Sequence, residues 1–136
     1  DVLAILCNAY NEEKLENDEI RVVLKIPPFL APVKVAVLPL TKKDGLPAKA
    51  QEILSNLKLL YNCKYEEKDS IGKRYRRQDA IGTPFCITVD HQTLNDNSIT
   101  LRSRDSMEQQ RVQIDDLNLI ISKKTNYIDA IKSINK

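Results

Sequence analysis

The stretch Lys34-Val-Ala-Val-Leu-Pro-Leu40 decides the fold of this chain. A continuous apolar run of this length is typical of a strand that lies inside a sheet and is covered on both faces. After the turn Lys42-Lys-Asp-Gly45, apolar residues recur at the spacing of a helix with one apolar side: Leu46, Ala50, Ile53, Leu54, Leu57 and Tyr61. A buried strand followed by a helix predicts a parallel crossover.

The segments after this helix continue to alternate. We predict strands at 63–67, 85–89, 98–104 and 108–114, and helices at 70–80 and from 116 onward. Asn126 and Asp129 resemble a capping box that restarts the last helix. From residue 34 the order is β-α-β-α-β-β-β-α, with short turns between the last three strands. The sequence therefore predicts an α/β fold with a mixed sheet flanked by helices.

The segment before residue 34 has a different pattern. We predict an amphipathic helix at 2–10, a polar loop at 11–19 and a strand at 20–26. Pro27, Pro28 and Pro32 then make a stiff connector. We therefore divide the chain into residues 1–26, a linker at 27–33, and a domain at 34–136.

Composition limits the classes of protein to which the chain can belong. Its 136 residues are 42% hydrophobic and 29% charged, with only three glycines, which indicates one globular domain rather than a disordered chain. No apolar run approaches the roughly 20 residues that span a bilayer, and the first residues show no signal-peptide pattern. We therefore expect a soluble, cytoplasmic protein.

We do not expect the thiols or the single histidine to form a reactive site. Cys7, Cys63 and Cys86 are odd in number and form no C-x-x-C pair, so we expect buried thiols rather than disulfides or a zinc site. His91 is the only histidine and is placed in a polar turn beside Asp90. No phosphate-cradling loop, carboxylate pair or metal-ligand cluster is present, so we expect this chain by itself to have no catalytic residues, metal or cofactor.

Positive charge is concentrated between residues 70 and 110, although the net charge of the chain is only +2. On a helix over 70–80 one face carries four cations, Lys73, Arg74, Arg76 and Arg77, and the opposite face carries Ile71 and Tyr75. Such a face can hold phosphates without reading sequence. The alternative is a solvated helix face that pairs with Glu66, Glu67 and Asp69.

The second cationic cluster lies in Leu101-Arg-Ser-Arg-Asp-Ser106. Strand alternation places Arg102 and Arg104 on the same face of the sheet, where two guanidinium groups could stack on bases or pair with phosphates. Polar side chains that could contact base edges follow, namely Asp105, Ser106, Gln109 and Gln110. Because the two glutamines are adjacent, at most one can share the arginine face. The alternative is a ladder of cross-strand salt bridges.

Four segments, in order, resemble the C-terminal anticodon-binding region of glycyl-tRNA synthetase of the dimeric class II type. They are residues 27–40, 43–50, 70–85 and 101–109, which include Lys43-Asp-Gly-Leu-Pro-Ala-Lys-Ala50 and Leu101-Arg-Ser-Arg-Asp-Ser-Met-Glu-Gln109. The resemblance implies the class II aminoacyl-tRNA synthetase anticodon-binding domain, with a five-stranded mixed sheet flanked by helices.

The resemblance also implies a function. Residues 1–26 would be the tail of a catalytic domain whose ATP- and glycine-activating motifs lie outside this sequence. The whole enzyme would be a homodimer that uses ATP and magnesium. This region would bind the anticodon arm of glycine tRNA, with Lys73, Arg74, Arg76 and Arg77 on phosphates. Bases would be recognised by Arg102, Arg104, Asp105, Ser106, Gln109 and Gln110.

Two other functions remain open from the sequence. The same fold is reused in the accessory subunit of mitochondrial DNA polymerase, so the chain could be a nucleic-acid-binding module without aminoacylation. A redox enzyme on a thioredoxin-like scaffold is a further alternative, which the scattered cysteines disfavour.

Overall fold

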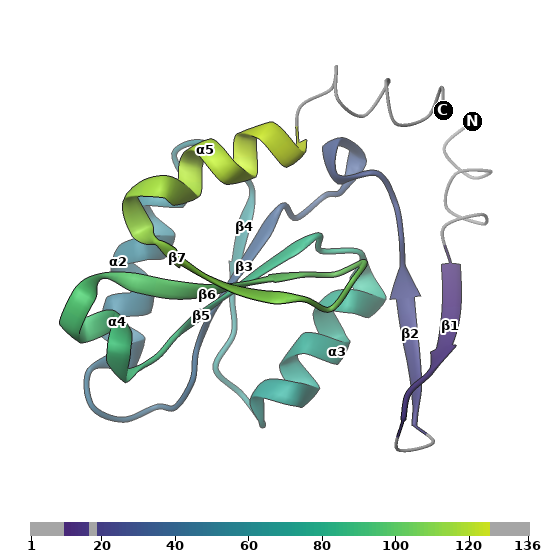
Figure 1. The fold of residues 1–136 in the computed structure, drawn as a ribbon, viewed down its shortest axis with the longest axis horizontal. Coiled ribbons are helices and arrows are strands. Elements are labelled where there is room, and N and C mark those ends of the chain that lie inside the picture. Colours follow the sequence, from purple (N-terminus) through teal and green to yellow (C-terminus); the bar gives the residue numbers. More distant parts are fainter. Residues whose placement is uncertain (1–9, 17–18, 126–136) are drawn as a thin grey trace.

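A five-stranded mixed sheet forms the centre of the computed structural model, which describes residues 10–16 and 19–125 (Figure 1). Its strands, in the spatial order β4-β3-β5-β6-β7, are β3 (Val35–Pro39), β4 (Cys63–Tyr65), β5 (Phe85–Val89), β6 (Ser98–Ser103) and β7 (Gln109–Gln113). β3 pairs in parallel with both β4 and β5, whereas β5, β6 and β7 pair antiparallel. The predicted mixed sheet, with parallel pairing around the crossover helices, is confirmed.

Helices cover both faces of this sheet (Figure 1). α2 (Leu46–Leu57) and α5 (Ile114–Thr125) pack on one face, and α3 (Ile71–Ile81) packs on the other. Gly45 has a φ of 76° just before α2, and Pro47 lies in the first turn of that helix, where its missing N–H costs no hydrogen bond. Ser70 caps α3, because its hydroxyl accepts from the Lys73 amide.

Residues 35–39 of the run at 34–40 do form a fully covered strand. Val35 and Val37 of β3 pack into the core beneath α2 and α5, while Ala36 and Leu38 pack beneath α3. Every residue of β3 and of its neighbour β5 is buried. Burial of each valine or leucine side chain stabilises the folded state by about 1.5–3 kcal/mol, so these two strands supply a large part of the core stability.

A short hairpin precedes the sheet. β1 (Tyr10–Lys14) pairs antiparallel with β2 (Ile20–Leu24), and a 3-10 turn, η1 (Pro28–Leu30), follows. β2 was predicted, but β1 corrects the prediction of a loop at 11–19. The polar segment can pair as a strand because Glu13 lies opposite Arg21, and their side chains form an ion pair at 2.6 Å. Of the helix predicted at 2–10, residues 2–9 lie outside the described residues, as does the capping box at 126–129.

One helix was missed by the sequence analysis. α4 (His91–Asp96) replaces the predicted polar turn between β5 and β6. Asp90 accepts from the Thr93 amide at 3.2 Å, and the Thr93 hydroxyl accepts from the Asp90 amide at 3.1 Å, which makes a reciprocal cap. With six residues α4 is too short to show a periodic pattern. His91 lies at its first position, with Nε2 2.9 Å from Oδ2 of Asp44.

Candidate nucleic-acid interface

The four cations of α3 do not form one open surface. Lys73 is exposed, as predicted, but Arg74 is buried and its guanidinium group binds backbone carbonyls. Its Nη1 donates to the carbonyl of Pro39 at 2.5 Å and its Nη2 donates to that of Leu40 at 3.1 Å. The prediction that Arg74 faces phosphates is therefore corrected: this side chain anchors α3 to the end of β3.

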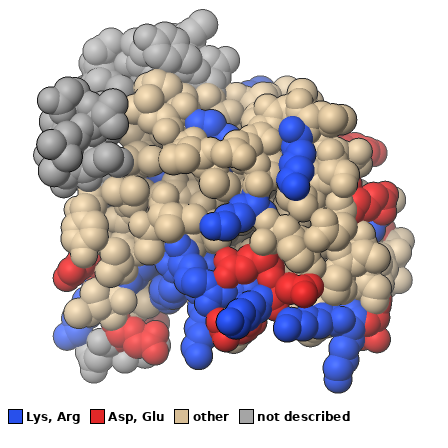
Figure 2. Space-filling view, turned by 180° about the vertical axis from the view of Figure 1, so that it is seen from behind, with Lys and Arg blue, Asp and Glu red and all other residues tan. Residues whose placement is uncertain are grey.

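The remaining two arginines of α3 are partly exposed and paired with acids. Arg77 pairs with Glu66 and also with Asp69, whose Oδ2 lies 2.8 Å from Nη1 of Arg77. Nη1 of Arg76 lies 3.9 Å from Oδ2 of Asp79. Figure 2 shows the same pattern on the face seen there, where acidic and basic side chains alternate over its lower part. The alternative of an ion-paired helix face describes Arg77 better than an open cationic surface does.

Arg102 lies in β6, whereas Arg104 directly follows the end of that strand, and both side chains are covered. Arg102 donates from Nη1 and Nη2 to the two carboxylate oxygens of Asp79, at 2.8 and 3.0 Å. Arg104 donates to the backbone carbonyls of Gly82 and Ile26, at 2.9 and 2.8 Å. Both residues are 2% exposed, which corrects the expectation that their guanidinium groups stand at the surface ready for bases.

Arg21 joins these residues into what we call the buried arginine cluster: Arg21, Asp79, Arg102 and Arg104. Nη1 of Arg21 donates to Asp79 at 3.1 Å and to the carbonyl of Arg104 at 2.7 Å. Burial by itself lowers the pKa of Arg102, but the hydrogen bonds and charge of Asp79 outweigh burial and hold that pKa above its ordinary value. The cluster ties the β1–β2 hairpin to α3 and β6.

Asp105 and Ser106 belong to the turn between β6 and β7. Asp105 accepts from Nε of Arg104 at 2.8 Å, and its side chain is half exposed. The hydroxyl of Ser106 accepts from the amide of Glu108 at 3.2 Å. Both side chains remain at the surface, where the sequence analysis expected them, but part of their hydrogen-bonding capacity shapes the turn.

A polar hollow, which we call the α3-side pocket, lies where β3 and β5 end. Its volume is about 200 Å³, and its lining comprises Leu40, Ile71, Tyr75, Thr88, Asp90, Thr100 and Gln109. Leu40 and Asp90 directly follow the carboxyl ends of the two parallel strands. In open α/β sheets ligands bind in the crevice at this end, so the position favours a binding site.

An ion pair missed by the sequence analysis borders the α3-side pocket. Arg111 of β7 donates from Nη1 and Nη2 to the two carboxylate oxygens of Asp90, at 2.8 and 2.9 Å. Hydrogen bonds from Arg111 hold the pKa of Asp90 below its usual value, so the carboxylate is charged at neutral pH. The alternation that places Gln109 on this face also places Arg111 there, so the signal was present in the predicted strand.

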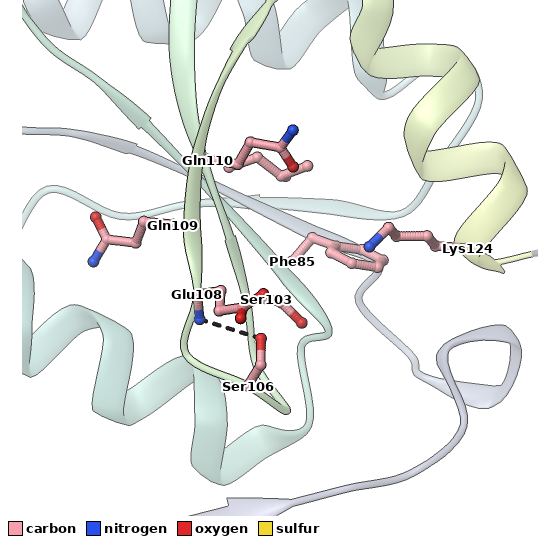
Figure 3. A pocket seen from close by; sticks show the side chains of 8 residues that line it. Phe85, Ser103, Ser106, Glu108, Gln109, Gln110 and Lys124 are labelled. Atoms are coloured by element: carbon pink, nitrogen blue, oxygen red, sulfur yellow. Dashed lines mark hydrogen bonds between the residues drawn. The ribbon is translucent and has the colours of Figure 1, made fainter.

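The two glutamines lie on opposite faces of β7, as expected. Gln109 is opposite Arg102 in the ladder and Gln110 is opposite Leu101. Gln110 lines a second hollow, which we call the α5-side pocket (Figure 3). This pocket has a volume of about 490 Å³ and is lined by Phe85, Leu101, Ser103, Ser106, Glu108, Gln109, Gln110 and Lys124.

The described residues also bear on metal sites, membrane-spanning helices and thiol chemistry. Within them no group of three His, Cys, Asp or Glu side chains gathers as a metal site, and no helix is long and apolar enough to cross a membrane. Burial raises the pKa of Cys63 to about 11 and that of Cys86 to about 12, so neither thiol is a ready thiolate. Cys7 lies outside this part of the chain. These pKa values disfavour the redox alternative.

Comparison with known proteins decides the family. A family model described as "Anticodon binding domain" matches residues 34–124. This chain belongs to the anticodon-binding domain family. The architecture of the domain is also that of a solved RNA-binding domain of threonyl-tRNA synthetase from Cryptosporidium parvum. The TM-score is 0.67 at 21% identity, over 74% of this chain and 25% of the other, which is a likeness of fold alone.

Curated relatives of this anticodon-binding domain are named glycine--tRNA ligase. The protein of Acetivibrio thermocellus is 56% identical over 115 residues, which is 85% of this chain and 24% of the relative. That of Malacoplasma penetrans is 59% identical over 116 residues, 85% of this chain and 25% of the relative. The protein of Clostridium tetani is 52% identical over 125 residues, 92% of this chain and 27% of the relative.

The chain thus spans about a quarter of the length of the curated relatives it matches. The resemblance to the anticodon-binding region of glycyl-tRNA synthetase is confirmed. These names give no support to the alternative of a DNA polymerase accessory module.

Proposed function

We propose that this chain is the anticodon-binding module of a glycine--tRNA ligase, and that it binds the anticodon arm of glycine tRNA so that the whole enzyme charges the correct tRNA. The observation that carries the proposal is the family match over residues 34–124, which includes every residue of the α3-side pocket. The pocket adds a polar site at the end of the sheet where ligands of such folds bind.

In this proposal the module positions the tRNA by binding its anticodon and does not itself make or break covalent bonds. Glycine anticodons share cytosine at their second and third positions, and the exocyclic amine of cytosine is a hydrogen-bond donor. The α3-side pocket offers acceptors in the Asp90 carboxylate, the Gln109 amide oxygen and the Thr100 hydroxyl. Because Arg111 holds Asp90 in its charged form, an unstacked cytosine would meet a fixed acceptor there rather than a titrating one.

Phosphate contacts are assigned to Lys73, the exposed cation of α3. Lys73 lies in the first turn of α3, and Ile71 of the same turn lines the α3-side pocket. Because Lys73 is on the helix face opposite Ile71, it would attract RNA phosphates away from the pocket without reading a base. Arg76 and Arg77 add weaker attraction, since Arg77 is already paired with two carboxylates.

The rest of the enzyme lies outside these 136 residues in this proposal. The catalytic domain would supply the groups that hold ATP and magnesium. We place the enzyme in the cytoplasm as a homodimer, on the family resemblance.

Substitutions on β7 test the proposal. Gln109→Ala should weaken binding of a glycine anticodon stem-loop by about 5- to 10-fold and flatten the preference over stem-loops whose second or third anticodon base is changed. Gln113→Ala is the matched control, because Gln113 is an exposed glutamine of the same strand that lines neither pocket. Lys73→Ala should weaken all stem-loops alike. Equal effects of Gln109→Ala and Gln113→Ala would contradict the assignment.

A further inference from the structure

The two pockets meet at one residue of an edge strand. β7 is the last strand of the sheet, and Gln109 lines both the α3-side pocket on one face and the α5-side pocket on the other. No further strand lies beyond β7 in the described sheet. An extended ligand can therefore pass around this edge and occupy both faces.

The rim of the α5-side pocket carries unused hydrogen-bonding groups. The side chains of Ser103, Glu108 and Gln110 have no hydrogen-bond partner in the described part of the chain, although all three line the pocket (Figure 3). They provide a hydroxyl, a carboxylate and an amide, and hence both donors and acceptors. A ligand with a mixed donor and acceptor edge would satisfy them better than a simple anion or cation.

The floor of the α5-side pocket is aromatic. Phe85 and Leu101 line the pocket, and Nζ of Lys124 is 5.8 Å from the centre of the Phe85 ring. Figure 3 shows the lysine side chain reaching from α5 across this ring. Phe85 is 4% exposed, so stacking on its ring requires the flexible Lys124 side chain to move aside. A flat ring can then stack there while the ammonium group pairs with a phosphate.

An aromatic floor, a mixed polar rim and an adjacent cation match the chemistry of an unstacked nucleobase with its phosphate. The volume of about 490 Å³ is within the usual range for small-molecule sites. We propose that the α5-side pocket is a second nucleobase subsite. One base occupies the α3-side pocket, a neighbouring base occupies the α5-side pocket, and the RNA strand crosses the sheet edge at Gln109. The inference rests on the proposed function for its RNA partner.

The test combines protein variants with single-site abasic stem-loops. Affinity of the 136-residue chain is measured for the glycine anticodon stem-loop and for versions that each lack one loop base. Gln110→Ala should weaken the intact stem-loop by about fivefold, and Lys124→Ala by a similar factor. Lys123→Ala is the matched control, because Lys123 is the neighbouring exposed residue of α5 and does not line the pocket.

Non-additive effects of Gln110→Ala and the loss of one loop base identify which base occupies the α5-side pocket. At one loop position, loss of the base should weaken the wild-type chain by about tenfold but weaken Gln110→Ala by less than threefold, because the variant has already lost part of that contact. If Gln110→Ala and Lys124→Ala bind as Lys123→Ala does, and no abasic position couples to Gln110, the second subsite is overturned while the proposed function stands. If the wild-type chain binds no stem-loop at all, the proposed function fails as well.

Discussion

Asp79→Asn is the substitution that probes the buried arginine cluster most sharply. The carboxylate of Asp79 is fully buried and accepts three hydrogen bonds, two from Arg102 and one from Arg21. Asparagine keeps the size of the side chain but removes its charge, and it replaces one acceptor with an NH₂ group that faces a guanidinium donor. Arg102 then loses its counter-ion, while Arg21 keeps only its pair with Glu13.

The expected loss in the free energy of unfolding follows from the burial of Asp79. Removal of one partner from a buried ion pair typically costs about 3–5 kcal/mol, because the remaining charge is left uncompensated. Domains are stable by only about 5–15 kcal/mol in total, so the variant should lose a large share of its stability. For a chain of this size the melting temperature should fall by about 10–20 °C. Glu52→Gln is the control: Glu52 is 63% exposed in its pair with Lys49, and its loss should cost less than about 0.5 kcal/mol.

Urea unfolding at neutral pH measures these differences, and a double-mutant cycle with Arg21→Met tests their cause. Once Asp79 is neutral, removal of Arg21 no longer breaks an ion pair with Asp79 and takes away positive charge beside the unpaired Arg102, so the double variant should lose at least about 1 kcal/mol less than the sum of the two single losses. A loss below about 1 kcal/mol for Asp79→Asn, or strict additivity with Arg21→Met, would refute the view that this cluster ties the hairpin to the domain.

Three further outcomes are expected. Arg74→Leu should destabilise the chain by about 3 kcal/mol because it leaves buried carbonyls without donors, whereas Lys73→Ala should stay within about 0.5 kcal/mol; equal losses in urea unfolding would contradict this. Hydrogen bonds from Ser98 and Gln92 lower the pKa of Asp96 from 3.8 to about 2, so its stabilising effect is present above pH 4 and lost as pH falls toward 2. Asp96→Asn should therefore flatten the dependence of unfolding free energy on pH in that window, and an unchanged slope would count against it. In a variant that keeps only Cys86, burial raises the pKa of the thiol to about 12, so it should react with a thiol reagent only after unfolding.

The core of the fold could be predicted because its signal is local. The apolar run at 34–40 and the one-sided helix after it follow directly from side-chain periodicity, and both are found as β3 and α2. β1 was missed because Tyr10–Lys14 is polar, and it becomes a strand through its partner Arg21 rather than through its own pattern. The composition of one segment does not reveal which other segment it will pair with as a strand.

The candidate site shows the same limit. Clustering of arginines in the sequence indicated a charged surface. The number of charges does not reveal that Arg102 binds Asp79 inside the protein. Nor does it reveal that Arg104 binds the backbone carbonyls of Gly82 and Ile26. Strand alternation did place Gln109 and Gln110 on opposite faces. The pairing of Asp90 with Arg111 beside the α3-side pocket could not be found without the structure, because Asp90 lies beside β7 only after the sheet has formed.

The most direct test of the central claim is the affinity of the wild-type chain for the glycine anticodon stem-loop and for a non-cognate stem-loop, each at low and at physiological salt. Phosphate attraction falls steeply with added salt for both RNAs, whereas hydrogen bonds to bases favour only the cognate one. The account predicts at least a tenfold preference for the glycine stem-loop that persists at physiological salt. Equal affinities at both salt concentrations would contradict anticodon recognition by this domain.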